Sequence, residues 1–274
     1  MYTEYQPSHL LVPYIDSYWE FKGNPDYGMR IHILPDGCTD FIFTLGEVAN
    51  AVEEGSLIMQ PYRSYFVGPM TKYSELVTYT ESIHMFGVRF LPCGLSCFTN
   101  LPLHEFVNSR VSTNEMKAVF DDTFIEKLGE QKHVTDRIRV VEEYLLAYLA
   151  RHYQPADSHV AMAVNMINHS KGKRSVRSLM DDVCLCQRHF ERKFKHYTGF
   201  TPKEYSRIVK FKNAVELLRT TTSANLLTTA VDAGYYDLAH FSKEIKSMSG
   251  NTPASFLSLT VPEETTLTYS EPQR

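Results

Sequence analysis

Hydrophobic positions in the C-terminal third of the chain repeat at helical spacing in two similar blocks. Residues 175–199 and 226–250 each combine an apolar-periodic helix, a short break and a second amphipathic helix that ends at a glycine. Apolar residues at intervals of three and four mark the buried face of a helix. Two linked units of this kind can place two helices in successive major grooves on one face of DNA. The repeat therefore predicts a sequence-specific DNA-binding domain with two helix-turn-helix units.

Residues 1–90 show the shorter period of β-strands. Polar and apolar residues alternate over 38–45, directly after the turn sequence Pro35-Asp36-Gly37. Further strands are expected at 57–59, 64–67, 75–80 and 83–90. Short strands broken by glycine and proline favour a small barrel or sandwich. The predicted fold class is α+β, with a small N-terminal β-barrel and its helices followed by an all-α domain.

A strong helix is predicted over 136–152, and its apolar stripe has two interpretations. Ile138, Val141, Leu145 and Tyr148 fall at the spacing of a helix–helix seam. Packing this stripe against its own copy would give a two-fold homodimer with a self-complementary interface. The alternative is that the stripe packs on the barrel of its own chain. We predict the dimer, with these four residues as its seam.

Breaks in these patterns set the expected domain boundaries. Residues 1–135 form a sensor or interaction domain, 136–153 a linker and dimerisation helix, and 156–260 the DNA-binding domain. A long helix is expected to bridge the two units from Pro202, with Thr201 as its N-cap. The polar, acidic tail 261–274 is predicted to be disordered.

Charge is divided unevenly along the chain and supports this organisation. The chain carries a formal net charge of −4. Residues 155–260 contain 15 Lys and Arg against 9 Asp and Glu, so they carry +6 and the remainder −10. A basic module joined to an acidic one is typical of a DNA-binding domain attached to a domain that does not bind DNA.

The second helix of each unit offers side chains suited to DNA. In the first unit Phe190 and Phe194 face the core, which leaves polar residues outward. Arginine bonds to guanine, glutamine to adenine, and glutamate accepts from cytosine. The predicted base-reading residues are Gln187, Arg188, Glu191, Arg192, Leu238, Ala239, Ser242 and Lys243. The predicted phosphate contacts, which give affinity without sequence information, are Lys193, Lys195, His196 and Lys246.

Local motifs in this region closely resemble the AraC/XylS family of bacterial transcription regulators. The segment 199–205, Gly-Phe-Thr-Pro-Lys-Glu-Tyr, resembles the end of the family's first unit, and 233–241 with 250–253 resembles the signature of its second. Ile245 and Thr229 depart from the usual residues of the second unit. The segments 32–40 and 90–95 resemble a module that some members carry. The resemblance implies a cupin-like sensor or interaction domain and frequent dimerisation through it.

An enzymatic or redox role for the N-terminal domain is the competing hypothesis. The candidate metal ligands are His32, Asp36, Cys38, Asp40 and His84, which lack the close His-x-His spacing of such metal sites. The candidate reactive thiols are Cys93, Cys97, Cys184 and Cys186, which we expect to be buried small hydrophobes. The sequence contains no phosphate-binding glycine loop, G-x-S-x-G or H-E-x-x-H motif. We therefore predict no enzyme, no metal and no cofactor.

The partners and compartment follow from these predictions. The expected partners are double-stranded DNA, a second copy of the chain, and as further candidates RNA polymerase and a small-molecule effector. No run of 18 apolar residues and no basic segment leading into an apolar one marks a membrane span or a secretory signal. The five cysteines show no disulfide spacing, which fits a reducing cytoplasm.

Overall fold

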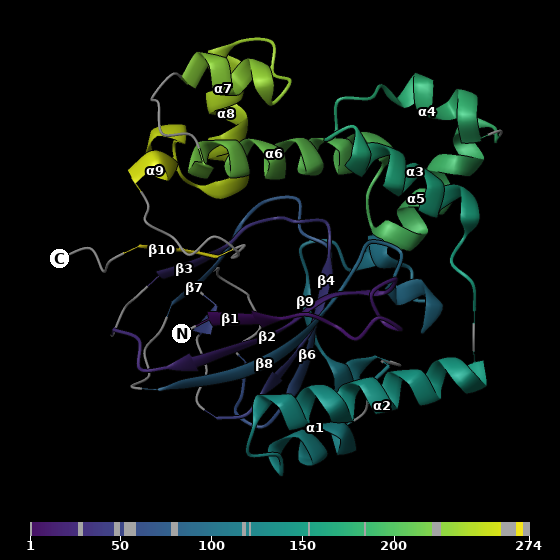
Figure 1. Cartoon of the computed structure of the whole chain (residues 1–274), viewed down its shortest axis with the longest axis vertical. Helices are drawn as coiled ribbons and strands as arrows, with labels where there is room; N and C mark the ends of the chain where they lie inside the picture. Colours follow the sequence, from purple (N-terminus) through teal and green to yellow (C-terminus); the bar gives the residue numbers. More distant parts are fainter. Residues whose placement is uncertain are drawn as a thin grey trace.

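The structure is a computed structural model of the whole chain. It describes residues 2–26, 30–46, 50–51, 59–77, 82–116, 119–120, 122–152, 154–183, 185–220, 226–258 and 267–270. A β-rich N-terminal domain carries two helices on one side, and a helical C-terminal domain lies on the other (Figure 1). The α+β fold class is therefore confirmed.

Two antiparallel sheets build the N-terminal domain. The first has the strand order β1 (Tyr2–Tyr5), β2 (Ile15–Gly23), β8 (Ile83–Phe90), β4 (Thr39–Thr44), β6 (Ser64–Val67) and β9 (Arg110–Ser112). The second has the order β10 (Leu267–Ser270), β3 (Arg30–Ile33), β7 (Ser74–Val77) and β5 (Asn50–Ala51). The described strands thus form two sheets rather than one closed barrel.

Both faces of the first sheet are buried, which explains its near-continuous apolar strands. Phe41 and Phe43 of β4 pack toward the helices α1 (Asp122–Gly129) and α2 (Val134–His152). Ile42, between them, packs toward the second sheet. Successive side chains of a strand point to opposite faces, so one strand serves both cores.

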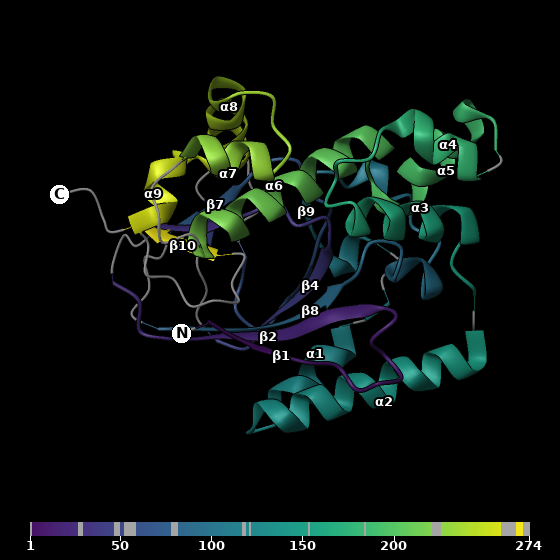
Figure 2. The ribbon, with the colours of Figure 1, turned by 45° about the horizontal axis from the view of Figure 1, so that its top comes forward.

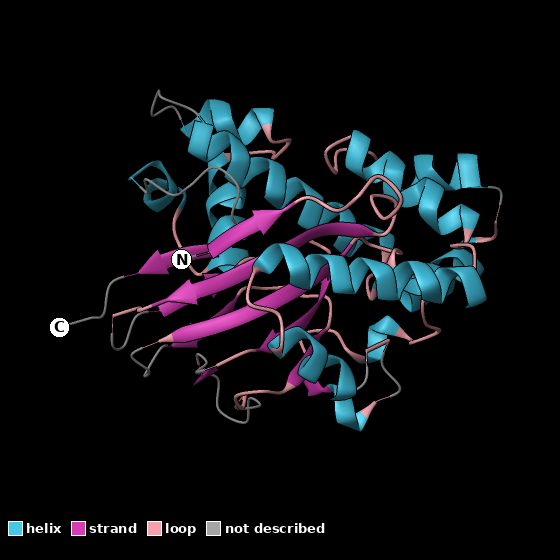
Figure 3. Ribbon diagram, turned by 60° about the horizontal axis from the view of Figure 1, so that its bottom comes forward, coloured by secondary structure: helices cyan, strands magenta, loops and turns pink. Residues whose placement is uncertain are grey.

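The apolar stripe of α2 packs on its own sheet, and this corrects the predicted dimer seam. Val141 and Leu145 are 0% exposed within the chain and belong to the core beneath β2, β4 and β8. Ile138 and Tyr148 are half-buried against the same core. Figure 3 shows α2 lying across the sheet. The alternative interpretation was correct, because the flat apolar face of the sheet needs a helical cover.

Several strand predictions are confirmed and several strands were missed. β6 and β8 match their predicted ranges, and β4 and β7 match in part. In the predicted strand 57–59, Met59 lies in a loop and the rest lies outside the described residues. β1, β2 and β3 were not predicted. The register of β2 against β8 shifts between Ile15 and Ser17, and this irregularity breaks the two-residue period.

The C-terminal tail is partly ordered, contrary to prediction. Leu267–Ser270 forms β10, which pairs antiparallel with β3, and Leu267 lies opposite Ile33. Local sequence could not indicate this pairing because its partner strand is more than two hundred residues away along the chain. The remaining residues of the predicted tail lie outside the described part of the chain.

The described part of the C-terminal domain contains seven α-helices, which follow the predicted pattern closely. They are α3 (Ser158–His169), α4 (Val176–Val183), α5 (Gln187–Thr198), α6 (Pro202–Thr220), α7 (Leu226–Asp232), α8 (Leu238–Ser249) and α9 (Pro253–Ser258). The predicted cap of α6 is confirmed. Thr201 Oγ1 accepts from the Glu204 amide at 3.2 Å, and Glu204 Oε2 accepts from the Thr201 amide at 2.7 Å. This reciprocal pair is a capping box.

The two domains meet in a close, specific contact beneath α6. Gly37 has a φ of +87°, and a Cβ built on it would lie 2.7 Å from Cε2 of Tyr205 in α6. At α8, the domains also meet where the Tyr73 amide donates to the Met248 carbonyl at 2.9 Å. Positive φ and the tight approach together require glycine at position 37. The predicted turn at 35–37 therefore seats the long helix of the DNA-binding domain.

The position of α2 leads to a stability prediction. We expect Leu145→Ala to lower the free energy of unfolding by about 2–5 kcal/mol, because it leaves a cavity in a fully buried core. Urea unfolding measures this change. The matched control Glu143→Ala lies on the exposed side of α2 and should change stability by less than about 0.5 kcal/mol. Equal small effects for both variants would contradict the packing of α2 on the sheet.

Candidate nucleic-acid interface and an internal cavity

The helix α5 has one polar face and one apolar face, and the apolar face is buried. Phe190 and Phe194 are fully buried and anchor it in the C-terminal core. Four base-reading residues were predicted on α5: Gln187, Arg188 and Arg192 are exposed, and Glu191 is half-buried. Gln187 Nε2 donates to Glu191 Oε1 at 2.9 Å. This contact joins two of the predicted readers along one helix face.

Two of the predicted phosphate contacts on α5 point elsewhere. Lys193 Nζ pairs with Asp157 Oδ2, the N-cap of α3, at 2.6 Å. His196 is half-buried, and its ring lies 6.3 Å from that of His104 on the short helix η2 (Leu103–Glu105). Burial, and secondly the nearby His104, lowers the pKa of His196. Lys193 therefore holds α3 and α5 together, and His196 faces the N-terminal domain; Lys195 remains exposed.

The helix α8 is set by the cap that the sequence predicts. Asp237 Oδ1 accepts from the His240 amide at 2.7 Å, and Phe241 and Ile245 are fully buried. Gly234, in the turn before it, has the expected positive φ of +85°. The exposed predicted residues of this helix are Leu238, Ala239, Lys243 and Lys246, and Ser242 is half-buried.

One exposed aromatic residue on this side of the second unit was not predicted. Tyr236 directly precedes the cap of α8 and is 92% exposed, although tyrosine is usually at least partly covered. Because Tyr236 is next to Asp237, the predicted N-cap of α8, the sequence could have indicated that it lies beside the proposed base-reading face. Leu227 and Val231 of α7 are also exposed, so this unit presents more apolar surface than the first.

The separation of the two units is fixed by α6. Figure 2 shows α4 and α5 at one end of this helix and α7 and α8 at the other. A helix of 19 residues is about 28 Å long at 1.5 Å per residue. One turn of DNA is roughly 34 Å. The arrangement therefore suits two major-groove segments about one turn apart.

The candidate metal ligands do not gather into one site. They are His32, Asp36, Cys38, Asp40 and His84. His32 Nε2 pairs with Glu75 at 2.8 Å in the second sheet, whereas His84 Nε2 pairs with Glu20 at 2.9 Å in the first. Among the described residues, no three His, Cys, Asp or Glu side chains are arranged to hold a metal ion.

The cysteines divide into buried and exposed positions. Cys38, Cys93 and Cys97 are buried, and burial raises the pKa of each thiol. The expectation of buried hydrophobic thiols holds for these three. Cys186 is exposed at the N-cap position of α5, so the expectation is wrong there. Cys184 lies outside the described residues.

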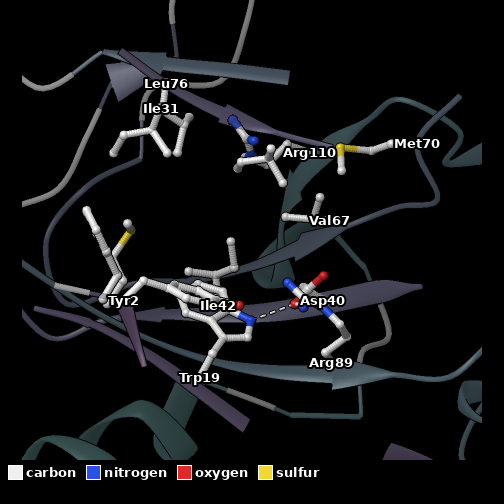
Figure 4. A pocket seen from close by; sticks show the side chains of 13 residues that line it. Tyr2, Trp19, Ile31, Asp40, Ile42, Val67, Met70, Leu76, Arg89 and Arg110 are labelled. Atoms are coloured by element: carbon white, nitrogen blue, oxygen red, sulfur yellow. Dashed lines mark hydrogen bonds and ion pairs between the residues drawn. The ribbon is translucent and has the colours of Figure 1, made fainter. Parts of the chain in front are cut away.

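A cavity lies between the two sheets (Figure 4). It has an empty volume of about 540 Å³, part of it open to solvent. Its walls are mainly apolar, and its polar groups come from Asp40, Arg89 and Arg110. The complete lining is Tyr2, Trp19, Phe21, Ile31, Ile33, Asp40, Ile42, Val67, Met70, Leu76, Met85, Arg89 and Arg110. Its composition is that of a small-molecule site, and a water-sized sphere can occupy about 50 Å³ of it.

Arg89 organises the polar end of this cavity. Its guanidinium lies 3.1 Å from Glu4, 3.4 Å from Asp36 and 3.3 Å from Asp40. Trp19 Nε1 also donates to Asp40 Oδ1 at 2.6 Å. Burial raises the pKa of Asp40 to about 6; Arg89 opposes this shift and Asp36 adds to it. The same Asp36 belongs to the turn beneath α6, so the cavity wall is joined to the domain contact.

Comparisons with known proteins bear on both domains. Residues 179–258 match the family model of a helix-turn-helix domain, and residues 3–112 match that of a domain of unknown function, DUF6597. No curated protein matches the chain. ToxT from Vibrio cholerae has a similar fold, with 9% identity and a TM-score of 0.52 over 88% of this chain and 98% of ToxT. ToxT with an unsaturated fatty acid bound gives 14% identity and a TM-score of 0.52 over 91% and 98%.

These findings define the class of the C-terminal domain. Residues 179–258 form a helix-turn-helix domain, a module that binds DNA. The likeness to ToxT establishes a shared two-domain fold. Within the described residues, no helix is long and apolar enough to cross a membrane.

The pKa of Asp40 leads to a prediction on stability and pH. A folded-state pKa of about 6 lies above the unfolded value of about 3.9. Asp40 therefore contributes most stability below about pH 4, and that contribution is lost as the pH rises through about 6. Relative to Asp40→Asn, the wild type should gain on the order of 2 kcal/mol in unfolding free energy between about pH 7 and pH 4. Urea unfolding of both proteins across this range measures the difference. A constant difference would contradict the buried, partly protonated carboxyl.

Proposed function

We propose that α5 and α8 each enter a major groove and read bases there. The exposed arginines of α5, Arg188 and Arg192, are the main readers, because a guanidinium can bond bidentately to guanine. Gln187 and Glu191 support them from the same face. The observation that carries this proposal is that α5 and α8, each ending at a glycine C-cap, lie toward opposite ends of α6 with one face exposed.

The second unit reads bases with smaller and more apolar side chains. Leu238 and Ala239 suit contacts with thymine methyl groups, and Ser242 and Lys243 suit polar contacts. Fewer hydrogen-bonding groups imply weaker discrimination than in the first unit. Lys195 and Lys246 are proposed phosphate contacts because both are exposed. Lys193 and His196 are left out, since each already contacts another side chain of the same chain.

The N-terminal domain is proposed to sense a small-molecule effector and to catalyse nothing. Its inter-sheet cavity supports sensing, and so does the fatty acid bound in a ToxT structure of similar fold. Arg89 joins the cavity to Asp36, whose carboxylate also accepts from the Cys38 amide at 2.9 Å. That turn carries Gly37 against Tyr205. A change at the cavity wall can therefore reach α6 through buried contacts.

Further partners remain predictions without an assigned surface. The homodimer has no assigned interface, because Val141 and Leu145 of the predicted α2 seam are buried within the chain. RNA polymerase fits a transcription regulator as a partner. Cytoplasmic location remains the expectation, since a bacterial regulator acts where the DNA is.

The assignment of Arg188 predicts a change in specificity. We expect Arg188→Ala to weaken binding to the preferred site by about 1–3 kcal/mol and to relax the base preference at one position. Binding-site selection with wild type and variant, followed by titration of the selected site, measures both effects. Arg139→Ala on α2, an exposed arginine in the N-terminal domain, is the control and should change neither. Unchanged site preference in Arg188→Ala would remove this residue from the readers.

The assignment of Lys195 as a phosphate contact predicts a different change in DNA binding. As a phosphate contact, its change to alanine should weaken binding about equally for all sequences and reduce the slope of log affinity against log salt by about 1. Titrations of specific and unrelated duplexes at several salt concentrations separate these effects. A loss confined to one base position would instead make Lys195 a reader.

A further inference from the structure

We propose that one loop of the N-terminal domain, residues 68–73 between β6 and β7, positions the two reading helices α5 and α8 relative to each other. This proposal rests on the proposed reading of bases by these helices and adds how their orientation is fixed. They end at the C-caps Gly199 and Gly250, both in the left-handed region. Each C-cap lies against a side chain of this loop, while most of the proposed readers stay exposed. The loop thus supports the helices without covering their reading faces.

The end of α5 contacts the first half of the loop, at Pro69. Gly199 has a φ of +84°, and a Cβ built on it would lie 2.6 Å from Cγ of Pro69 and 3.2 Å from the carbonyl oxygen of Leu103. Pro69 is itself buried. Because this contact leaves no room for even a methyl group, the C-cap of α5 packs directly on the N-terminal domain.

The end of α8 contacts the last residue of the loop, Tyr73. A Cβ built on Gly250 would lie 2.8 Å from Cζ of Tyr73. The Tyr73 amide donates to the Met248 carbonyl at 2.9 Å. The ring of Tyr73 packs against the hydrophobic core of the C-terminal domain, and its centroid lies 5.1 Å from that of His32 on β3. Tyr73 therefore holds the end of α8 through its side chain and its backbone.

Hydrogen bonds to Asn108 hold the loop in place. Asn108 Oδ1 accepts from the Thr71 amide at 2.8 Å, and Asn108 Nδ2 donates to Thr71 Oγ1 at 2.8 Å. The Asn108 amide also donates to the Pro69 carbonyl at 2.9 Å. Tyr73 follows Pro69 by four residues, so their Cα atoms are at most about 14 Å apart. One short, fixed loop thus gives both helix ends a common support, and we infer that α6 sets their separation and this loop their orientation.

The dependence of DNA binding on site spacing tests this role. One base pair added between the two segments of a selected site moves the second segment by about 3.4 Å and rotates it by about 34°. A fixed pair of helices cannot follow, so the wild type should bind the longer site at least about tenfold more weakly.

Tyr73→Ala should release the end of α8. We expect about tenfold weaker binding at the original spacing, because the orientation is no longer fixed in advance, and less than about threefold further loss on the longer site. Tyr73→Phe keeps the ring against Gly250 and should behave like wild type. Tyr62→Ala removes a 65% exposed tyrosine of the same domain and is the matched control, which should change neither affinity nor spacing dependence.

A second pair of variants acts on the loop without touching either helix. Asn108→Gly removes both side-chain contacts with Thr71 and suits the φ of +57° at this position. It should reduce the spacing dependence as Tyr73→Ala does. Asn108→Asp keeps the acceptor for the Thr71 amide and should restore the dependence. If Tyr73→Ala does not fold, the two Asn108 variants decide the matter.

Two results would overturn the proposal. One is weaker binding by the folded Tyr73→Ala and Asn108→Gly variants with the full tenfold loss on the longer site, which would leave these contacts a purely structural role. The other is binding like that of wild type at both spacings. Either result, with a wild type that selects a site and depends on its spacing, refutes the role of the loop alone. A wild type that selects no site refutes the reading helices, and this proposal with them.

Discussion

The seating of α6 on the N-terminal domain is the contact on which the rest of the structure depends. α6 buries Tyr205, Ile208, Phe211 and Leu218 along its length and is the common core element of both helix-turn-helix units. Its first turn is fixed by the Thr201–Glu204 capping box, and Tyr205 rests on the turn at Gly37. A helix buried on several sides has little freedom to bend or rotate, so the two units keep one separation and one relative orientation.

The same contact gives the N-terminal domain a route to the DNA-binding helices. Asp36 links the cavity to this contact. Its carboxylate faces Arg89 at the cavity, and its backbone belongs to the turn under Tyr205. Tyr205 in turn donates to Asn168 of α3 at 2.9 Å. A closely packed path of this kind transmits small displacements, because such interiors are not easily compressed. The regulation proposed for this protein thus needs no large motion between domains.

Much of the DNA-binding domain could be predicted because its signals are local. The helical period, the caps at Asp237 and Thr201 and the positive φ of Gly234 all act within a few residues. The sheets were less predictable. The bulge in β2 breaks its period, and β10 depends on a partner at the other end of the chain. For the stripe on α2, periodicity showed that it must be buried but not against what, since a sheet and a second chain offer similar apolar surfaces.

The same distinction holds for the candidate sites. Exposed residues of α5 and α8 follow from helix geometry, so most proposed readers were identifiable. Lys193 and His196 have partners, Asp157 and His104, on other elements, which the local sequence could not indicate. The cavity could not be foreseen at all, as Trp19, Asp40 and Arg110 come from three strands that only the fold brings together.

The central claim is that one chain reads two segments of DNA on one face of the duplex, held apart by α6. Hydroxyl-radical footprinting and base-interference mapping on a selected site test it most directly. The account predicts two contacted major-groove segments about one helical turn apart on the same face, and loss of binding when about five base pairs are inserted between them. A single contacted segment, or full affinity after that insertion, would contradict it.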